Sequence, residues 1–524
     1  MQGASKYRLF DTLDRTGRTH RAASTVAITA GGRDQSFAEL RDRALRLANG
    51  LIGLGVRPGS RVGVLMSNRH EWTEALFAVA ASGGVCVPIN VLLRGLEAGY
   101  IIDDSDVDVL IVDERGEQPL AELPRLPSTI ITVGDVVVPV GANVRTFESV
   151  IESGAAVYPS VQIGAEDAVM TYYTSGTTGR SKGATHSHQG INWNTMSQVH
   201  DLSVRSNDRY LVVPSLSWAA GFHDVTMALM WNGGTNVLMP TGAATIETII
   251  DQVVENRITH TLLVPVLLRE LAANPPLLAR LRDSELRWVL TGAEPVPATL
   301  TNELNAELPA CDVVQGYGMS EFPLIASLLR PEEAVEHAGK AGRPTSITSI
   351  MVQTADGQIT DVGEGEILTR SPAAMLGYHG MPEATEEAFR DGWFHTGDTG
   401  RLDEEGFLAV TGRQKDMIIS GGMNIYPREI EDVIIAQLGI RDVAVVGVQD
   451  DRWGEVPVVV LLASAAGSAD DVMRVCQEQL SSYKRPKRVI VREEPFPRTP
   501  NGKLLKRELG PWAQEQITGS AEPQ

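Results

Sequence analysis

Before Gly339, short apolar segments alternate with longer stretches of helical periodicity, and this alternation is the feature that most constrains the fold. Strands are predicted at 61–66 and 85–89, with a helix over 70–82 between them. Further strands are predicted near 107–112, 168–173, 209–214, 235–239, 259–264 and 286–290. Strands that are buried on both faces and joined by helices are typical of parallel sheets. The chain therefore predicts an α/β fold with parallel sheets covered by helices.

One helix carries its own start signal. Ser36 and Glu39 match the capping-box pattern, in which the two side chains satisfy backbone N–H groups of the first turn. Apolar residues follow at helical spacing over 40–51, and Gly53 and Gly55 come after them. The pattern predicts a helix that begins after Ser36 and ends near Gly53.

The length and composition of the segments change twice after this region. From about Gly339 to Gly412 the segments shorten and Gly and Asp are frequent, which predicts a small, largely antiparallel or barrel-like unit. After Arg413 we expect a compact α+β unit. Its helices are predicted at about 427–438 and 470–481, and its strands at 442–448, 456–462 and 488–492. Residues 511–524 are polar without periodicity, so we expect a disordered tail there.

Charge and composition exclude several classes of protein. The 524 residues carry a formal net charge of −20, and a field of that sign excludes a broad surface for nucleic acid or anionic lipid. The three cysteines are far apart and form no CxxC pattern, so we expect free thiols in a reducing compartment. No apolar run approaches the ~20 residues that span a bilayer, and no signal peptide is evident. We therefore expect a cytoplasmic protein without membrane insertion.

The sharpest local motif is the segment 172–183, which reads YYTSGTTGRSKG. A predicted strand enters a loop rich in glycine and hydroxyl residues, and Lys182 follows. Backbone N–H groups, hydroxyls and a lysine together can hold a polyphosphate. The loop is not a Walker A motif, because Lys182 follows Ser181 and precedes Gly183. His186 and His188 alternate along the next predicted strand, and two histidines without a third ligand are expected to be polar residues, not metal ligands.

Five motifs in one order carry a resemblance that covers about residues 36–509. They are the 172–183 loop, QGYGMSE at 315–321, GWFHTGD at 392–398, GRQKD at 412–416 and PRTPNGK at 497–503. Their order and spacing resemble those of the adenylate-forming superfamily, which contains acyl-CoA synthetases, nonribosomal adenylation domains and luciferases. Within this superfamily the chain most resembles the fatty-acyl or aryl CoA ligases. The resemblance implies an N-terminal domain (1–413) of two covered β-sheet subdomains plus a small β-barrel-like subdomain. It also implies a mobile α+β C-terminal domain (414–510).

The resemblance implies an ATP site. Residues expected to bind ATP or AMP are Thr174, Ser175, Gly176, Thr177, Thr178, Gly179, Lys182, Gly292, Ala293, Glu294, Gln315, Gly316, Tyr317, Ser320, Asp398, Arg413 and Lys415. The 174–182 loop would hold the β- and γ-phosphates, Tyr317 would stack on adenine, and Asp398 would accept bonds from the ribose hydroxyls with help from Arg413. Ser181 and Ser320 depart from the family pattern, which more often has Pro and Thr there.

The implied catalytic residues are Lys503, Glu321 and Ser320. Glu321, with Thr174, would bind Mg²⁺, since carboxylate oxygen is the ligand that this ion prefers. Lys503 would contact the substrate carboxylate and the α-phosphate, and Ser320 would bond the α-phosphate. A carboxylate is already ionised at pH 7, so the reaction needs positive charge and positioning more than a base.

The resemblance also implies a domain switch. Lys503 lies in the small unit and the phosphate loop lies in the large one, so one site needs both domains. Lys415 falls at the family's hinge position. After adenylation, the 420–424 loop would replace Lys503, and Gly421, Gly422 and Met423 would line a channel for the thiol of coenzyme A.

The substrate pocket is less determined. Trp218, Gly221, Phe222, Gly292 and Gly318 are the residues expected to line the acyl pocket. Trp218 takes the place where the family often has His, although a shift of one register position is open. A bulky indole there favours a small, medium-chain, cyclic or aromatic carboxylic acid over a long-chain one.

Three functions remain open at this stage. The expected reaction is acid activation with ATP followed by transfer to CoA. A second option keeps the adenylation but transfers the acyl group to an amine or to a carrier-protein thiol. A third is a nucleotide-binding regulatory protein without catalysis, against which the presence of Lys503, Glu321 and Asp398 argues. The oligomeric state is open, with a homodimer among the options.

Overall fold

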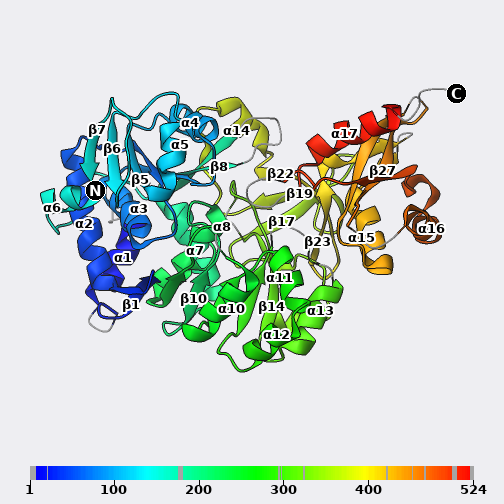
Figure 1. Cartoon of the computed structure of the whole chain (residues 1–524), viewed down its shortest axis with the longest axis horizontal. Coiled ribbons are helices and arrows are strands. Elements are labelled where there is room, and N and C mark those ends of the chain that lie inside the picture. Colours follow the sequence, from blue (N-terminus) through cyan, green and yellow to red (C-terminus); the bar gives the residue numbers. More distant parts are fainter. Residues whose placement is uncertain are drawn as a thin grey trace.

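The fold is described from a computed structural model (Figure 1). The structure describes residues 7–19, 22–174, 181–242, 244–292, 296, 298–322, 325–420, 423–450, 452–464, 468–498 and 504–519. Within these residues the strands form four sheets. The helices and strands sit where the alternation predicted them in most of the chain, and the α/β class is confirmed.

The first large sheet has eight strands among the described residues, in the order β20-β9-β8-β4-β3-β5-β6-β7. Its strands are β3 (Arg61–Leu65), β4 (Val85–Ile89), β5 (Val109–Asp113), β6 (Thr129–Val133), β7 (Asn143–Thr146), β8 (Ala168–Thr174), β9 (Lys182–Ser187) and β20 (Gly377–Tyr378). The pairs from β8 to β7 are parallel, whereas β9 runs antiparallel to β8. Its helices are α2 (Phe37–Gly53), α3 (His70–Ser82), α4 (Gly95–Asp104), α5 (Glu117–Ala121) and α6 (Phe147–Ser153).

The predicted capping box is present at the start of α2. The Ser36 side chain accepts a hydrogen bond from the Glu39 N–H, and the Glu39 carboxylate accepts from the Ser36 N–H. The apolar face of α2 packs against α3, whose residues are buried almost throughout. The helix therefore begins directly after Ser36, as the sequence predicted.

The second large sheet has nine described strands, in the order β16-β15-β14-β13-β12-β10-β11-β1-β2. They are β1 (Val26–Ala30), β2 (Arg33–Ser36), β10 (Arg209–Val212), β11 (Thr235–Leu238), β12 (His260–Leu262), β13 (Trp288–Thr291), β14 (Asp312–Tyr317), β15 (Ser327–Leu329) and β16 (Arg343–Pro344). Its helices are α1 (Leu9–Arg18), α7 (His188–Asp201), α8 (Ala219–Phe222), α9 (Thr226–Asn232), α10 (Ile246–Glu255), α11 (Pro265–Ala272), α12 (Pro275–Arg282) and α13 (Ala298–Glu307). One hydrophobic core joins helices α2 and α3 to strands of both large sheets.

The region from 349 to 413 forms the antiparallel unit expected there. Its strands are β17 (Ser349–Gln353), β18 (Ile359–Thr360), β19 (Gly363–Arg370), β21 (Phe389–Arg390), β22 (Trp393–Leu402) and β23 (Leu408–Arg413), with the helix α14 (Pro382–Ala388). Strand β22 pairs with both β19 and β23, so the sheet branches at β22. This branch brings the ends of two predicted motifs side by side.

The C-terminal α+β unit lies at one end of the molecule (Figure 1). Its sheet contains β24 (Ile418–Ser420), β25 (Met423–Ile425), β26 (Val443–Asp450), β27 (Gly454–Leu462) and β28 (Arg488–Arg492). Helices α15 (Pro427–Leu438), α16 (Ala469–Gln479) and α17 (Lys506–Gly519) belong to the same unit.

The expectation of a disordered tail is wrong for residues 511–519, which belong to α17. Leu509 and Ala513 are fully buried in a cluster with strands β26 and β27. The Lys506 ammonium donates to Glu431 Oε1 at 2.6 Å, and the Arg492 guanidinium lies 4.6 Å from the Trp512 ring centre. Packing against the sheet therefore holds a helix that its polar composition did not predict. Residues 520–524 lie outside the described part.

Two further expectations can be compared with the structure. The three cysteines are free and buried, as expected. The helices among the described residues include none that combines the length and the apolar composition of a membrane-spanning segment.

Candidate active site

The phosphate-loop motif joins two antiparallel strands. Thr174 ends β8 and pairs with Lys182 at the start of β9, so the two residues face each other across the base of the loop. The Tyr100 hydroxyl donates to the Ser181 carbonyl at 2.9 Å, and the Lys182 ammonium lies 4.8 Å from the Tyr378 ring centre. The predicted ligands Ser175, Gly176, Thr177, Thr178 and Gly179 lie outside the described residues. Strand pairing thus brings together Thr174 and Lys182, the two predicted ligands at the base of the loop.

The ends of β13 and β14 form the next part of the site. Gly292 follows β13, and a Cβ placed there would lie 2.6 Å from the Gly316 carbonyl oxygen. Only glycine allows this close approach of two backbones. Gln315 is buried in β14, and Gly318 is exposed just beyond it. Ala293 and Glu294 lie outside the described residues.

Asp398 is at the centre of a buried polar cluster. The Tyr317 hydroxyl donates to Asp398 Oδ2 at 2.8 Å, and Arg413 Nε lies 2.6 Å from Asp398 Oδ1. Strand pairing sets this geometry, because Asp398 on β22 is directly opposite Arg413 on β23. Burial raises the pKa of Tyr317 well above its ordinary value, and the Asp398 carboxylate raises it further. Burial lowers the pKa of Arg413, but Asp398, Tyr317, Glu321 and Asp416 together outweigh it and the net shift is upward, so the guanidinium stays charged.

Ser320 and Glu321 are held by two side chains that the sequence analysis did not place in the site. His186 Nε2 lies 2.7 Å from the Ser320 carbonyl oxygen, and a carbonyl only accepts, so Nε2 carries the proton. Burial lowers the pKa of His186 to about 4, which keeps the ring neutral. The Tyr378 hydroxyl donates to Glu321 Oε1 at 3.2 Å. The proximity of His186 to the QGYGMSE motif depends on tertiary structure, and no local signal marks Tyr378.

The earlier interpretation of the two histidines needs a correction. Only His186 lies on β9, because His188 is the first residue of α7. Both are buried, and His188 Nδ1 accepts a hydrogen bond from the Leu9 N–H at 3.2 Å. They are therefore interior groups with separate partners.

The donor set around Glu321 fits Mg²⁺ when the ion is shared with a phosphate. Glu321 offers carboxylate oxygens, which are hard ligands. Among the described residues, no group of three or more His, Cys, Asp or Glu could hold a metal by itself. A Mg²⁺ ion that keeps few protein ligands and binds phosphate oxygens matches this arrangement.

The structure separates the predicted acyl-pocket residues near α8: Trp218 is half-buried, whereas Phe222 lies in the hydrophobic core. Trp218 is half-buried at the start of α8. Gly221 allows α8 to approach the preceding loop, since a Cβ there would lie 2.0 Å from the Ser215 carbonyl oxygen. Phe222 is fully buried and packs on Trp72, with 5.4 Å between ring centres. The Phe222 ring thus belongs to the core.

The predicted hinge and thiol channel lie in the C-terminal part. Lys415 is exposed in a short 3₁₀ segment, Gln414–Asp416, between β23 and β24. Met423 begins β25 and is 47% exposed. Gly421, Gly422 and Lys503 lie outside the described residues. Arg498 and Leu504, on either side of Lys503, form an antiparallel bridge.

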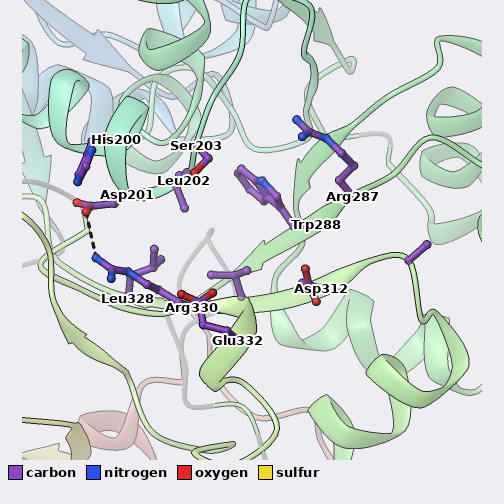
Figure 2. Close-up of a pocket in the computed structure, with 12 residues that line it drawn as sticks. His200, Asp201, Leu202, Ser203, Arg287, Trp288, Asp312, Leu328, Arg330 and Glu332 are labelled. Atoms are coloured by element: carbon purple, nitrogen blue, oxygen red, sulfur yellow. Dashed lines mark hydrogen bonds and ion pairs between the residues drawn. The ribbon is translucent and has the colours of Figure 1, made fainter. Parts of the chain in front are cut away.

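A separate pocket of about 480 Å³ lies at the opposite ends of β13 and β14 (Figure 2). Trp288 and Asp312, at the start of these strands, line it. Its two arginines have carboxylate partners, because Arg330 is 3.4 Å from Asp201 and Arg287 bonds Asp208. None of the predicted ATP-binding residues lines this pocket, so it is distinct from the candidate site.

Two family models match most of the chain. The model of the family "AMP-binding enzyme" matches residues 14–379, and that of its C-terminal domain matches residues 429–503. The chain is 36% identical to the long-chain-fatty-acid–CoA ligase FadD13 of Mycobacterium tuberculosis over 90% of this chain and 92% of that protein. It is also 36% identical to a feruloyl-CoA synthase of Amycolatopsis sp, over 94% and 96%.

A solved structure extends the agreement to the fold. The anthranilate CoA ligase AuaEII in complex with anthranoyl-AMP superposes with a TM-score of 0.86 at 25% identity, covering 99% of both chains. The two matched domains and the relatives that are 36% identical over at least 90% of this chain carry the assignment. The chain belongs to the adenylate-forming AMP-binding enzymes.

Proposed function

We propose that this protein is an AMP-forming acid–thiol ligase that activates a carboxylic acid with ATP and transfers the acyl group to coenzyme A. The observation that carries the proposal is the buried Tyr317–Asp398–Arg413 cluster next to Ser320 and Glu321. An aromatic face, a carboxylate suited to two ribose hydroxyls and a nearby metal ligand form a nucleotide site. The chain matches relatives named as CoA ligases or synthases over nearly their whole length, and this supports the same reaction.

The first half-reaction joins two anions. A carboxylate oxygen of the substrate attacks the α-phosphorus of ATP, and the bond to the leaving pyrophosphate breaks. Lys182 would hold the β- and γ-phosphates, and Lys503 would neutralise charge on the carboxylate and the α-phosphate. Glu321 would hold Mg²⁺ against the phosphates, and the ion would supply positive charge there. Asp398 would orient the ribose, since Arg413 and Tyr317 fix its two oxygens.

The second half-reaction is thioester formation. The thiol sulfur attacks the acyl carbon, the bond to the adenylate oxygen breaks, AMP leaves, and the thiol proton is released to water. Our proposal assigns the thiol channel to Gly421, Gly422 and Met423, and the hinge to Lys415.

One feature favours CoA over a simple amine as acceptor. Trp453 is 40% exposed beside Gly454, which pairs with Ser420, and the cations of Arg452 and Lys487 lie 4.9 and 5.8 Å from its ring. An exposed aromatic ring with two cations suits a phosphorylated nucleotide.

The preferred substrate class is a small, medium-chain, cyclic or aromatic acid. Trp218 at the start of α8 supports this preference, as do relatives named for ferulate and anthranilate. The relative named for long-chain fatty acids points the other way. We further propose a cytoplasmic location.

The decisive test is a panel of carboxylic acids assayed with ATP and CoA. We expect AMP and a thioester in equal amounts, with cyclic or aromatic acids ahead of palmitate. A clear preference for palmitate would overturn the substrate class. Release of AMP with an amine or a carrier protein, but not with CoA, would replace the acceptor. Absence of pyrophosphate with every acid would leave only a regulatory role.

A further inference from the structure

Four polar side chains meet in the interior between the two large sheets. They are Tyr172 on β8, Tyr210 on β10, and His223 and Asp224, which follow α8. Their exposed fractions are 3%, 0%, 3% and 6%. The Tyr172 and Tyr210 hydroxyls, His223 Nε2 and Asp224 Oδ1 hydrogen-bond to none of the described residues.

Ring contacts place this cluster behind the candidate active site. The His223 ring centre lies 5.2 Å from that of Tyr172 and 6.0 Å from that of His186. His186 in turn contacts the Ser320 carbonyl oxygen. Asp224 directly follows His223, and its carboxyl is close enough to the Tyr210 phenol to raise the pKa of that phenol, after burial itself. The cluster therefore extends from the back of the Ser320 segment toward β10.

A strained turn fixes Asp224 in place. Val225 has φ 66° and ψ −40°, and the Thr226 N–H donates to the Asp224 carbonyl at 2.7 Å, which makes a γ-turn centred on Val225. A β-branched residue at positive φ is costly, and such strain persists where the surroundings hold it. The Gln198 side chain does so, because its Oε1 accepts from the Val225 N–H at 2.7 Å.

Burial favours the uncharged forms of the titratable groups in this cluster. It raises the pKa of Asp224 well above its ordinary value, and burial followed by the nearby His186 lowers the pKa of His223 well below its own. Among the described residues, no ion pair joins the members of the cluster to one another. Buried polar groups almost always have a hydrogen-bond partner, so four such atoms in one place indicate that a polar ligand atom completes the set.

We propose that Asp224, Tyr172 and Tyr210 form the distal end of the acyl pocket and recognise an uncharged hydroxyl or keto oxygen on the carboxylic acid. The proposal rests on the proposed function. Its position in the chain agrees, since His223 lies two residues after Gly221 of the predicted pocket and Tyr172 lies two residues before Thr174. A plain hydrocarbon tail would leave these groups without partners, which is how polar pockets reject the analogue that lacks the oxygen.

The test compares acids that differ by one oxygen. We would measure kcat/KM for pyrophosphate release with 3-(4-oxocyclohexyl)propanoate against 3-cyclohexylpropanoate, and with 3-(4-hydroxyphenyl)propanoate against 3-phenylpropanoate. The oxygenated acid of at least one pair is expected to be preferred by about tenfold or more. Tyr210→Phe and Asp224→Ala should each reduce that preference by about tenfold, with the KM for ATP unchanged.

Thermal unfolding without substrate separates recognition from a structural role. Removing a buried hydroxyl that has no protein partner should leave the melting temperature of Tyr210→Phe unchanged or higher. The matched control is Tyr158→Phe, because the Tyr158 hydroxyl donates to Asp11 Oδ1 at 2.8 Å. That variant should lose stability and keep the wild-type preference among acids.

Two results would overturn the inference. One is equal kcat/KM for both members of every pair in the wild-type protein. The other is a marked loss of stability in Tyr210→Phe with unchanged acid preference, which would show that the hydroxyls bind structural water. Absence of pyrophosphate with all acids would instead contradict the proposed function, so the two failures are distinguishable.

Discussion

Two buried side chains, Asp398 and His186, hold the described part of the site by different means. Asp398 keeps a charged partner, Arg413, directly across the strand pair, whereas His186 stays neutral and holds the Ser320 carbonyl oxygen. The sequence motifs identify Asp398 as a site residue but not His186. The reason is that His186 contacts Ser320, which lies 134 positions away in the sequence. Each residue has a consequence for stability that can be measured.

Asp398→Asn should reduce both stability and ATP binding. The change removes the carboxylate that pairs with the Arg413 guanidinium, whose side chain is 29% exposed, so we expect a loss of about 1–3 kcal/mol in the free energy of unfolding. The KM for ATP should rise as well. Asp251→Asn is the matched control, since its pair with Arg280 is exposed on both sides and should contribute less than about 1 kcal/mol. Urea unfolding and ATP–pyrophosphate exchange measure the two effects, and equal losses in both variants would contradict the prediction.

His186 should make stability depend on pH. Its pKa is about 4 in the folded protein against an ordinary 6.5, so the unfolded chain takes up the proton first as the pH falls. The stabilisation is fully present above about pH 6.5 and is lost as the pH falls toward 4. We expect the wild type to lose about 2–3 kcal/mol more than His186→Gln between pH 7.5 and 4.5. Urea unfolding at both values tests this, and parallel losses in the two proteins would refute it.

At the level of elements, the predictions succeeded where a local pattern decides. The capping box at Ser36 begins α2, and the helix predicted over 427–438 is α15 with the same bounds. They failed at α17, where Pro511 and the polar residues around it concealed an apolar stripe of Leu509, Ala513 and Ile517. A helix with Pro in its interior is costly in isolation, so tertiary packing must offset that cost.

Deletion of residues 511–524 should therefore destabilise the C-terminal unit. It removes the buried Ala513, the Trp512 ring beside Arg492, and Gln514, whose Oε1 accepts from the Gln449 N–H at 2.6 Å. We expect a loss of about 2–5 kcal/mol, as for removal of a large buried side chain. Deletion of residues 520–524 is the control, because it removes none of these contacts. Differential scanning calorimetry of both truncations would decide, and identical melting of the long truncation and the wild type would rule out a docked helix.

On the scale of the whole molecule, the proposed chemistry needs two units that are distant in the sequence. Most of the predicted ATP-site residues that the structure describes lie in or next to the large sheets and the β22–β23 pair, whereas Lys503 falls within the residues that the C-terminal family model matches. The short 3₁₀ segment with Lys415 connects them. In our proposal the small unit presents Lys503 for adenylation and the 420–424 loop for thioester formation.

Lys503→Ala should separate the two half-reactions. Loss of one positive charge at the α-phosphate is expected to slow adenylation by about 10²–10³-fold. Thioester formation from supplied acyl-adenylate should change far less, since Lys503 would be away from the site in that step. Single-turnover assays of each step measure this directly. Equal loss of both steps would contradict the domain switch.

The sequence by itself determined the α/β class, two helices and three strands of the C-terminal unit, and the family, because these follow from hydrophobic periodicity and from motifs of contiguous residues. Only the tertiary structure decided which strands are neighbours and which distant groups share the site. Tyr317 meets Asp398 across 81 positions, and His223 with Asp224 meets Tyr172 and Tyr210 from three separate parts of the chain. The physical reason is that burial and pairing energies depend on what each group contacts after folding, and a linear pattern does not contain those contacts.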